Sequence, residues 1–362
     1  MKTLGFQERK KLISALEEVR GSRVLTYFLP DRETLPPGIP GFSIQLRTEP
    51  HLLFVDQLRA MGKTKQLDLF LYTRGGETDS VWPLVSLLRQ YCEKLTVIVP
   101  FRAHSGGTLI CLGADEVIMT DLAELSPIDP TTGNQFNPSD PANPQNRFGI
   151  SVEDVTAYFT LSKELAGITN KSQKLDVFKE LSGKVHPLAL GNVQRVYLQI
   201  RRLAERLLAQ HMRDKRNSQK IKEIIEALTE KFYSHLHAIP RAEAVSLFGD
   251  WVRSPTNKED PVIWGLFNSY ANTLELRTRF NLPEYMGDEQ IRELKVLGGF
   301  IESTQLSHIH LTEMKVMQRP NLPPNVQVQV PPGQPLPLVP WVGRMYDYGI
   351  RAMRWKINEG ED

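Results

Sequence analysis

Four short, mostly apolar runs constrain the fold of this 362-residue chain more than any other feature of its sequence. They are RVLTYFL at 23–29, LDLFLYT at 67–73, LTVIVP at 95–100 and EVIM at 116–119. Continuous apolar runs of this length are typical of strands buried on both faces, as in parallel sheets. Helical patterns separate the runs, at about 50–61, 79–91 and 105–112. The alternation predicts an α/β fold built from βαβ units around a sheet.

Composition adds a few limits to this fold. The hydrophobic share of 41% and the charged share of 24% are ordinary for a soluble globular protein, and a net charge of +2 gives no reason to expect nucleic acid as a partner. No stretch approaches the roughly 18 apolar residues of a membrane span, so we expect no membrane span and a cytoplasmic location. Cys92 and Cys111 lack metal-ligand spacing, and we interpret them as buried thiols of a reducing compartment.

The pattern divides the chain into an N-terminal helix at 1–22, an α/β domain at 23–254 and a C-terminal extension at 255–362. Helices are expected from Ser151 to Gly167 and from Asn192 to His211. The extension is predicted to be helical in part, with a Pro-rich, extended stretch at 319–340 and a short terminal helix in 344–362. We expect it to serve assembly or partner binding.

Ser105 is the residue that most directly suggests chemistry, because it stands between a predicted strand and a predicted helix and is followed by Gly106 and Gly107. A serine acts as a nucleophile only with a base and with donors for the oxyanion. The first N–H groups of a helix lack intrahelical partners. Gly75 and Gly76 follow the preceding strand, and the turns after parallel strands meet at one sheet edge. The alternative is a helix cap and two ordinary glycine turns.

Four segments of the chain resemble the serine dehydrogenase proteinase family of the ClpP/crotonase superfamily. They are LYTRGGET, VIVPFRAHSGGTLICLGADEVIMTDLAELSPIDP, KVHPLALG and SHLHAIPRAEAVSLFG, and the resemblance as a whole covers roughly 23–251. Two departures are Arg74, where the family has proline, and His104 before the serine. The membrane helix that many relatives carry is not found. The resemblance implies a ClpP/crotonase-like spiral of βαβ units that assembles into a homo-oligomer.

The same resemblance implies that Ser105 is the nucleophile and that the amides of Gly75, Gly76 and Gly106 form the oxyanion hole. It implies no metal and no nucleotide cofactor. It does not determine the base, because ClpP has a histidine where this chain has Asp129 in SPIDP. The Ser-His-Asp arrangement therefore cannot be transferred directly.

Lys163 is one candidate for the base. Signal-peptide peptidases and archaeal relatives use a Ser-Lys pair, and AYFTLSKELAG is similar to their lysine helix. Lys163 follows Phe159 by four residues and Val152 by eleven, which places all three on one helix face. A lysine that faces inward is desolvated, and its lowered pKa lets it act as a base. The alternative is a lysine at the edge of the apolar stripe with its amine in water.

Histidines are the other candidates for the base. His186 in KVHPLALG ranks first among them, because it lies within a family-like motif. His235 and His237 lie near the position of the ClpP aspartate, and His104 adjoins the serine. Each of the four also has a structural or surface interpretation.

The sequence therefore predicts a serine endopeptidase that acts on a protein or peptide substrate, with a regulatory or unfoldase partner as a further expectation. The first alternative is a non-proteolytic oligomeric scaffold in which Ser105 is only a turn residue. The second alternative is a crotonase-like acyl-CoA enzyme, and the segment HSGGT at 104–108 argues against it. The basic run around 201–220 is interpreted as a solvated helix face, because it lacks the aromatic residues typical of nucleic-acid binding.

Overall fold

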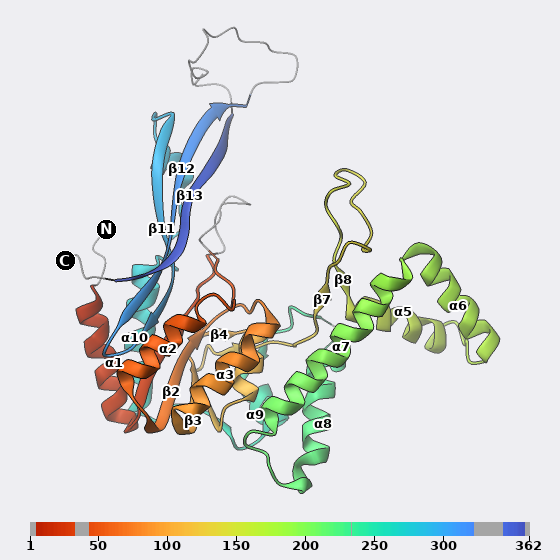
Figure 1. Ribbon diagram of the computed structural model, residues 1–362, viewed down its shortest axis with the longest axis horizontal. Coiled ribbons are helices and arrows are strands. Elements are labelled where there is room, and N and C mark those ends of the chain that lie inside the picture. The colour runs from red at the N-terminus through yellow and green to blue at the C-terminus, as the bar shows by residue number, and fades with distance from the viewer. Residues whose placement is uncertain (1–4, 33–42, 233, 322–342, 359–362) are drawn as a thin grey trace.

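The central element of the protein is an eight-stranded sheet in the order β10-β5-β3-β2-β1-β11-β12-β13. The computed structural model describes residues 5–32, 43–232, 234–321 and 343–358 (Figure 1). The parallel strands are β1 (Arg23–Phe28), β2 (Thr64–Tyr72), β3 (Cys92–Val99), β5 (Glu116–Met119) and β10 (Val252–Arg253). The antiparallel strands are β11 (Ile291–Glu302), β12 (Ser307–Pro320) and β13 (Arg344–Ile357). The predicted parallel α/β core is confirmed.

Helices cover both faces of the parallel strands, because alternate strand residues point to opposite faces. Leu69 and Leu71 of β2 belong to one core, while Phe70 and Tyr72 belong to the other. The first core is covered by α2 (His51–Met61), α3 (Val81–Gln90), α4 (Gly106–Leu112), α7 (Pro187–Leu208), α8 (Ser218–Glu226) and α9 (Arg241–Phe248). The second core is covered by α1 (Phe6–Arg20) and α10 (Glu259–Thr273).

Short elements complete the body of the protein. A small sheet joins β4 (Arg102–Ala103), β6 (Glu124–Leu125) and β9 (Ile239–Pro240), and β7 (Thr131–Thr132) pairs with β8 (Ile150–Ser151). The remaining helices are α5 (Val152–Glu164), α6 (Lys171–Lys184) and α11 (Leu282–Met286). Single helical turns lie at Thr78–Ser80, Lys215–Asn217 and Ala227–Lys231.

The arm, which we define as α5, α6 and the first half of α7, stands apart from the sheet in Figure 1. None of the residues of α6 is buried. The expected helix from Ser151 begins as predicted, with the Ser151 hydroxyl accepting the Glu153 amide at 3.0 Å. Sequence reasoning missed α6, and it placed the start of α7 five residues too late.

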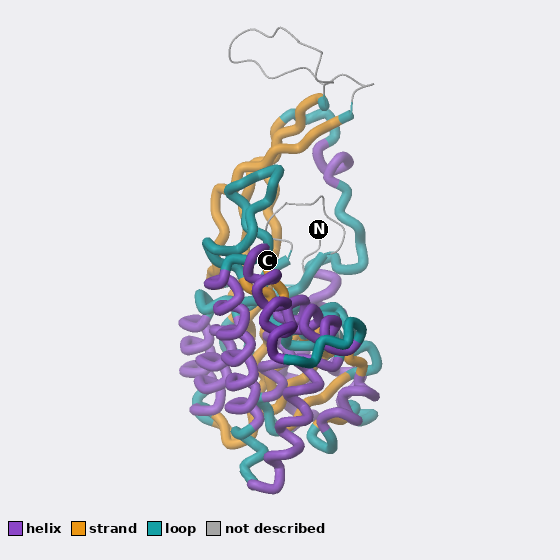
Figure 2. Tube along the Cα trace, turned by 90° about the vertical axis from the view of Figure 1, so that its right-hand side faces the viewer, coloured by secondary structure: helices purple, strands orange, loops and turns teal. Residues whose placement is uncertain are grey.

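The ribbon, which we define as β11, β12 and β13, extends beyond the helical body (Figures 1 and 2). Its first strand pairs with β1, so the C-terminal part of the chain continues the central sheet. The prediction of a terminal helix in 344–362 is wrong. Residues 344–357 instead form β13, which is hydrogen-bonded along its length to β12. Residues 322–342 of the expected Pro-rich stretch lie outside the described residues. The domain boundary after residue 254 stays a prediction.

A buried ion cluster links α1 to the ribbon. The Arg9 guanidinium donates two hydrogen bonds to the Glu302 carboxylate, at 2.7 and 2.8 Å. Glu302 is 0% exposed and also accepts hydrogen bonds from the hydroxyls of Tyr270 and Ser307. Its backbone amide donates to the Thr26 hydroxyl in β1 at 3.1 Å. The cluster therefore fixes α1, α10, β1, β11 and the start of β12 to one another.

Candidate active site

Ser105 occupies a tight turn between β4 and α4, with φ 51° and ψ −109°. Only one other non-glycine residue in the described part of the chain has a positive φ. This conformation is unfavourable for a residue with a Cβ and persists only where the surroundings enforce it. Two sets of contacts enforce it: the Ser105 amide donates to the Ser126 hydroxyl at 2.8 Å, and the Thr108 hydroxyl donates to the carbonyls of Ala103 and Ser126. The serine side chain is half-buried.

The Gly75 turn packs directly against the Ser105 turn. A Cβ on Gly75 would lie 2.7 Å from the Ser105 Cβ and 2.9 Å from the His104 carbonyl oxygen. Gly75 also has φ +97°, a conformation that favours glycine. The two turns thus need a glycine here for two independent reasons, and the expectation that they meet at one sheet edge is confirmed.

Two backbone amides beside Ser105 have no hydrogen-bond partner in the part of the chain that the structure describes. The amide of Gly75 donates to the Thr73 hydroxyl at 3.0 Å, so it is not available to a ligand. Within the described ranges, no hydrogen bond is found for the amides of Gly76 and Gly106 or for the Ser105 hydroxyl. A Cβ on Gly106 would lie 3.8 Å from the Gly76 nitrogen, which shows how closely these two glycines approach. Among the described residues, nothing therefore accepts a hydrogen bond from two of the three predicted oxyanion donors.

Leu46 closes one side of this turn pair. Its amide donates to the Gly75 carbonyl at 2.8 Å, and its carbonyl accepts the Glu77 amide at 2.9 Å. Its side chain is 1% exposed and lies where a Cβ on Gly106 would be 2.8 Å from Cδ1. Sequence reasoning did not single out this residue, since nothing in SIQLRTEP marks it as a neighbour of the glycine turns.

Lys163 lies on α5, in the arm, and its side chain is exposed. The expectation that it faces inward is therefore wrong for the single chain. The start of α5 is fixed near the body by the hydrogen bond from the Val152 amide to the Pro130 carbonyl. Lys163 is eleven residues further along, a rise of roughly 16 Å. The structure does not bring Lys163 and Ser105 together in one chain.

His186 also lies outside the Ser105 turn. It caps α7, because its Nδ1 accepts the Leu188 amide at 3.2 Å, and its ring stacks on Phe136 at 4.7 Å between centroids. These contacts agree with the structural interpretation that the sequence analysis left open for His186. Its role as a base stays a prediction.

Asp129 and His235 form a carboxylate–imidazole pair. Asp129 is 3% exposed, and its Oδ1 lies 3.0 Å from His235 Nδ1. This hydrogen bond is the main cause that raises the pKa of His235 above its usual value. Asp129 is three residues after Ser126, whose hydroxyl accepts the Ser105 amide. The sequence places Asp129 and His235 near the positions of the ClpP triad but does not show that they pair.

His104 is held by a group of charges beside the nucleophile. Its Nε2 lies 3.1 Å from Glu124 Oε1, and Arg102 donates to the same oxygen at 2.7 Å. Burial lowers the pKa of His104 to about 4, so its ring is neutral at pH 7.

The Arg74 side chain pairs with Asp31; this arginine stands where the family that the sequence resembles has proline.

Among the helices in the described part of the chain, none combines the length and apolar character that crossing a bilayer requires.

Relatives of this chain are found among proteins without an assigned activity. Uncharacterized protein MJ0137 of Methanocaldococcus jannaschii is 28% identical over 239 residues, which cover 66% of this chain and 71% of that protein. Uncharacterized protein MJ1495 of the same organism is 30% identical over 151 residues, which cover 42% of this chain and 51% of that protein. The match thus spans about half the length of the second relative.

Similar solved structures are two mutants of a 1510-N membrane-bound stomatin-specific protease, both 15% identical to this chain. A serine-to-alanine mutant has a TM-score of 0.34 and a match covering 58% of this chain and 72% of that chain. A lysine-to-alanine mutant in complex with a substrate peptide has a TM-score of 0.33, with 58% and 68% covered. The α/β fold class itself rests on the central sheet with its five parallel strands and its covering helices. Residues 1–157, which include both glycine turns and Ser105, match the family of ClpP-like SDH-type serine proteinases.

Proposed function

We propose that this protein is a serine peptidase with Ser105 as its nucleophile. The observation that carries the proposal is the turn at Ser105, where a hydroxyl without a hydrogen-bond partner among the described residues lies beside the free amides of Gly76 and Gly106. The positive φ of Ser105 supports the same assignment, because backbone strain is retained where a fold fixes a functional side chain. The family match over residues 1–157 supports peptide-bond hydrolysis as the reaction.

The reaction follows from this arrangement. Ser105 Oγ attacks the peptide carbonyl carbon while its proton passes to a base, and the carbonyl oxygen becomes an oxyanion. The amides of Gly76 and Gly106 donate to that oxyanion, and the positive end of α4 favours its charge. The base returns the proton to the leaving amine, which leaves an acyl ester on Ser105. Water activated by the same base then releases the carboxylic acid.

The base has two candidates with different support. The resemblance supports Lys163, which would have to reach Ser105 from the arm of a second copy or through movement of its own arm. The structure supports His235, because Asp129 can hold the tautomer with a proton on Nδ1 and leave the Nε2 lone pair for Ser105. We propose His235 as the base, since Asp129 and Ser126 belong to the same short segment beside the nucleophile.

The arm supports assembly of copies of this chain, as the superfamily resemblance implies. Its exposed apolar side chains are Phe159, Leu161, Leu175, Phe178 and Leu188. We propose a homo-oligomer that covers them, and light scattering of the purified protein tests this. A regulatory or unfoldase partner and a cytoplasmic location remain proposals that rest on the resemblance alone. The non-proteolytic scaffold remains the alternative to the enzyme.

A fluorophosphonate probe tests the nucleophile. The Ser105 oxygen would displace fluoride from phosphorus and form a stable phosphonyl ester, with its proton taken by the base. We expect labelling of the wild-type protein, mapped by mass spectrometry to the peptide that contains Ser105, and no labelling of Ser105→Ala. The Ser80→Ala variant is a matched control, because that serine only caps its own turn. Absence of labelling in the folded wild-type oligomer would establish the scaffold alternative instead.

The identity of the base is tested by the rate and pH dependence of that labelling. We expect His235→Gln to slow labelling about a hundredfold or more, the range of general-base effects. Lys163→Met and the neighbouring control His237→Gln should leave the rate unchanged. The wild-type rate should rise with pH through a midpoint above the usual histidine pKa of 6.5, because the raised pKa of His235 keeps it protonated to higher pH. Slow labelling in Lys163→Met with a normal His235→Gln would assign the base to Lys163.

A further inference from the structure

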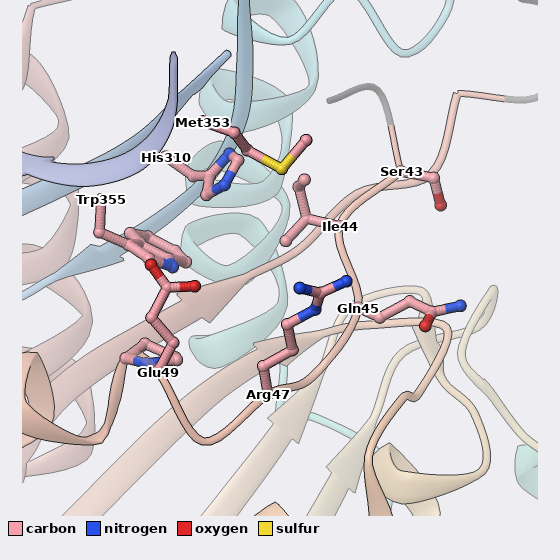
Figure 3. Close-up of a pocket in the computed structure, with 9 residues that line it drawn as sticks. Ser43, Ile44, Gln45, Arg47, Glu49, His310, Met353 and Trp355 are labelled. Atoms are coloured by element: carbon pink, nitrogen blue, oxygen red, sulfur yellow. The ribbon is translucent and has the colours of Figure 1, made fainter. Parts of the chain in front are cut away.

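A cavity of about 270 Å³ lies between the segment at residues 43–50 and the ribbon (Figure 3). Ile44, Arg47 and Glu49 line it from the segment, and His310, Met353 and Trp355 line it from β12 and β13. The peptidase chemistry described above uses none of these side chains. The cavity therefore needs an explanation of its own.

The polar residues that line the cavity are Ser43, Gln45, Arg47, Glu49 and His310, and they include one charge of each sign and an imidazole. Arg47 is exposed, and no ion pair or side-chain hydrogen bond is found for it within the described ranges. In Figure 3 its guanidinium points into the space between Ile44 and Glu49. His310 is 4% exposed, and its Nδ1 has no hydrogen-bond partner among the described residues. Burial and the Arg47 charge lower the pKa of His310 to about 4, so it is neutral at pH 7.

The apolar groups of the cavity lie together on its other side. Trp355 packs edge-on against His310, with 5.4 Å between ring centroids. Met353 and Ile44 face the same space in Figure 3. A ligand that fills this cavity would therefore place an apolar group here, an anion at Arg47 and a hydrogen-bond donor at Glu49. Arginine is well suited to such a site because its planar fork binds a carboxylate through two hydrogen bonds.

We infer that this cavity binds the C-terminal residue of a peptide whose last side chain is apolar. The terminal carboxylate would bind Arg47, the N–H of the last residue would face Glu49, and the side chain would pack on Ile44, Met353 and Trp355. A free apolar amino acid shares the carboxylate and the side chain, and its ammonium would also suit Glu49. We choose the peptide because the segment that carries Arg47 is hydrogen-bonded through Leu46 to the Gly75 turn of the candidate active site.

The position of the cavity relates it to the Ser105 turn. Leu46 lies between Gln45 and Arg47 in sequence and is bonded on both sides to the Gly75 turn. A peptide held at Arg47 is thus bound to the same segment that closes the candidate active site. This part of the inference rests on the proposed function, because a peptidase releases a new C-terminal carboxylate at each cleavage. The cavity itself can be tested without any activity.

Calorimetric titration of the full-length Ser105→Ala protein tests the inference, since this protein cannot turn a peptide over. The probes are acetyl-alanyl-leucine, its C-terminal amide, and free leucine. We expect the acid to bind, and the amide to bind at least tenfold more weakly. Arg47→Gln should weaken binding of the acid at least tenfold. Arg59→Gln on α2 is the matched control, because it removes the same charge from an exposed position outside the cavity, and it should leave binding unchanged.

Three results would overturn the inference: no binding of the acid at millimolar concentration, equal binding of the acid and the amide, or unchanged binding in Arg47→Gln. Free leucine binding as tightly as the dipeptide would replace the peptide with a free amino acid as the ligand. Thermal melting of each variant confirms that it is folded. Failure here would leave fluorophosphonate labelling of the wild-type protein intact, so the two proposals fail separately.

Discussion

Replacing Gly75 with alanine is expected to reduce fluorophosphonate labelling of Ser105 by about a thousandfold. The added Cβ would lie 2.7 Å from the Ser105 Cβ and 2.9 Å from the His104 carbonyl oxygen, so the two turns must move apart. That movement displaces the serine from the amides of Gly76 and Gly106. A displacement of about 1 Å is enough to cost about a hundredfold in rate, and the weakened hydrogen bond to the oxyanion brings the total loss to about a thousandfold.

The control for Gly75→Ala is Gly62→Ala. Gly62 also has a positive φ of +74°, but a Cβ there would meet nothing within 4 Å. With ψ 179°, Gly62 has a backbone conformation that is essentially restricted to glycine, so this variant bears a cost of about 1–3 kcal/mol without any clash. We expect it to lower the thermal midpoint and to keep the wild-type labelling rate. Normal labelling in Gly75→Ala would show that the Ser105 turn does not depend on close approach of the Gly75 turn.

The largest effect on stability is expected for Glu302→Gln. The glutamine cannot neutralise Arg9, and it leaves a guanidinium that is 2% exposed without its carboxylate. Removing one partner of a buried ion pair costs about 3–5 kcal/mol in the free energy of unfolding. Tyr270 and Ser307 also donate to this carboxylate, so the same variant disturbs their hydrogen bonds. Urea unfolding followed by circular dichroism measures the change.

Two further variants serve as controls for the unfolding of Glu302→Gln. Glu293→Gln on the same strand removes an exposed carboxylate that pairs with Arg351, and exposed pairs contribute about 1 kcal/mol or less. The double variant Arg9→Met with Glu302→Leu removes both charges and should be more stable than Glu302→Gln. If Glu302→Gln unfolds at the same urea concentration as Glu293→Gln, the cluster does not hold α1 to the ribbon.

The parallel strands were predictable because a strand that is buried on both faces needs a continuous run of apolar residues, which is visible in the sequence. The run EVIM, for example, is β5 with the bounds expected. The terminal segment was misassigned because β13 is exposed over most of its length and has no apolar face of its own. Its strand conformation depends on pairing with β12, which is a tertiary contact. The helix α6 was also missed: Leu175, Phe178 and Leu181 form only a narrow apolar face, and none of the residues of this helix is buried.

The nucleophile turn was predictable from local chemistry, whereas the base was not. Gly106 and Gly107 directly follow Ser105 in the chain, and Gly75 and Gly76 follow the neighbouring strand β2. The sequence therefore shows how these residues are arranged. Asp129 and His235 are 106 residues apart, and only the folded chain brings them together. The apolar spacing of Lys163 was real, but the face it marks is uncovered in the single chain. Helical periodicity in a sequence identifies a helix face that can be buried, but it does not identify the element or the subunit that covers this face.

The pairing of β1 with β11 determines when the sheet can be completed during synthesis. Thr26 of β1 is bonded to Glu302 of β11, which is 276 residues later. At a ribosomal rate of about 5–20 residues per second, the outer edge of β1 waits roughly 14–55 seconds for its partner. Until Glu302 has been synthesised, the Arg9 guanidinium lacks the carboxylate with which it pairs in the folded protein. A nascent chain that stops near residue 254 thus carries the entire nucleophile turn on a sheet that is still open at one edge.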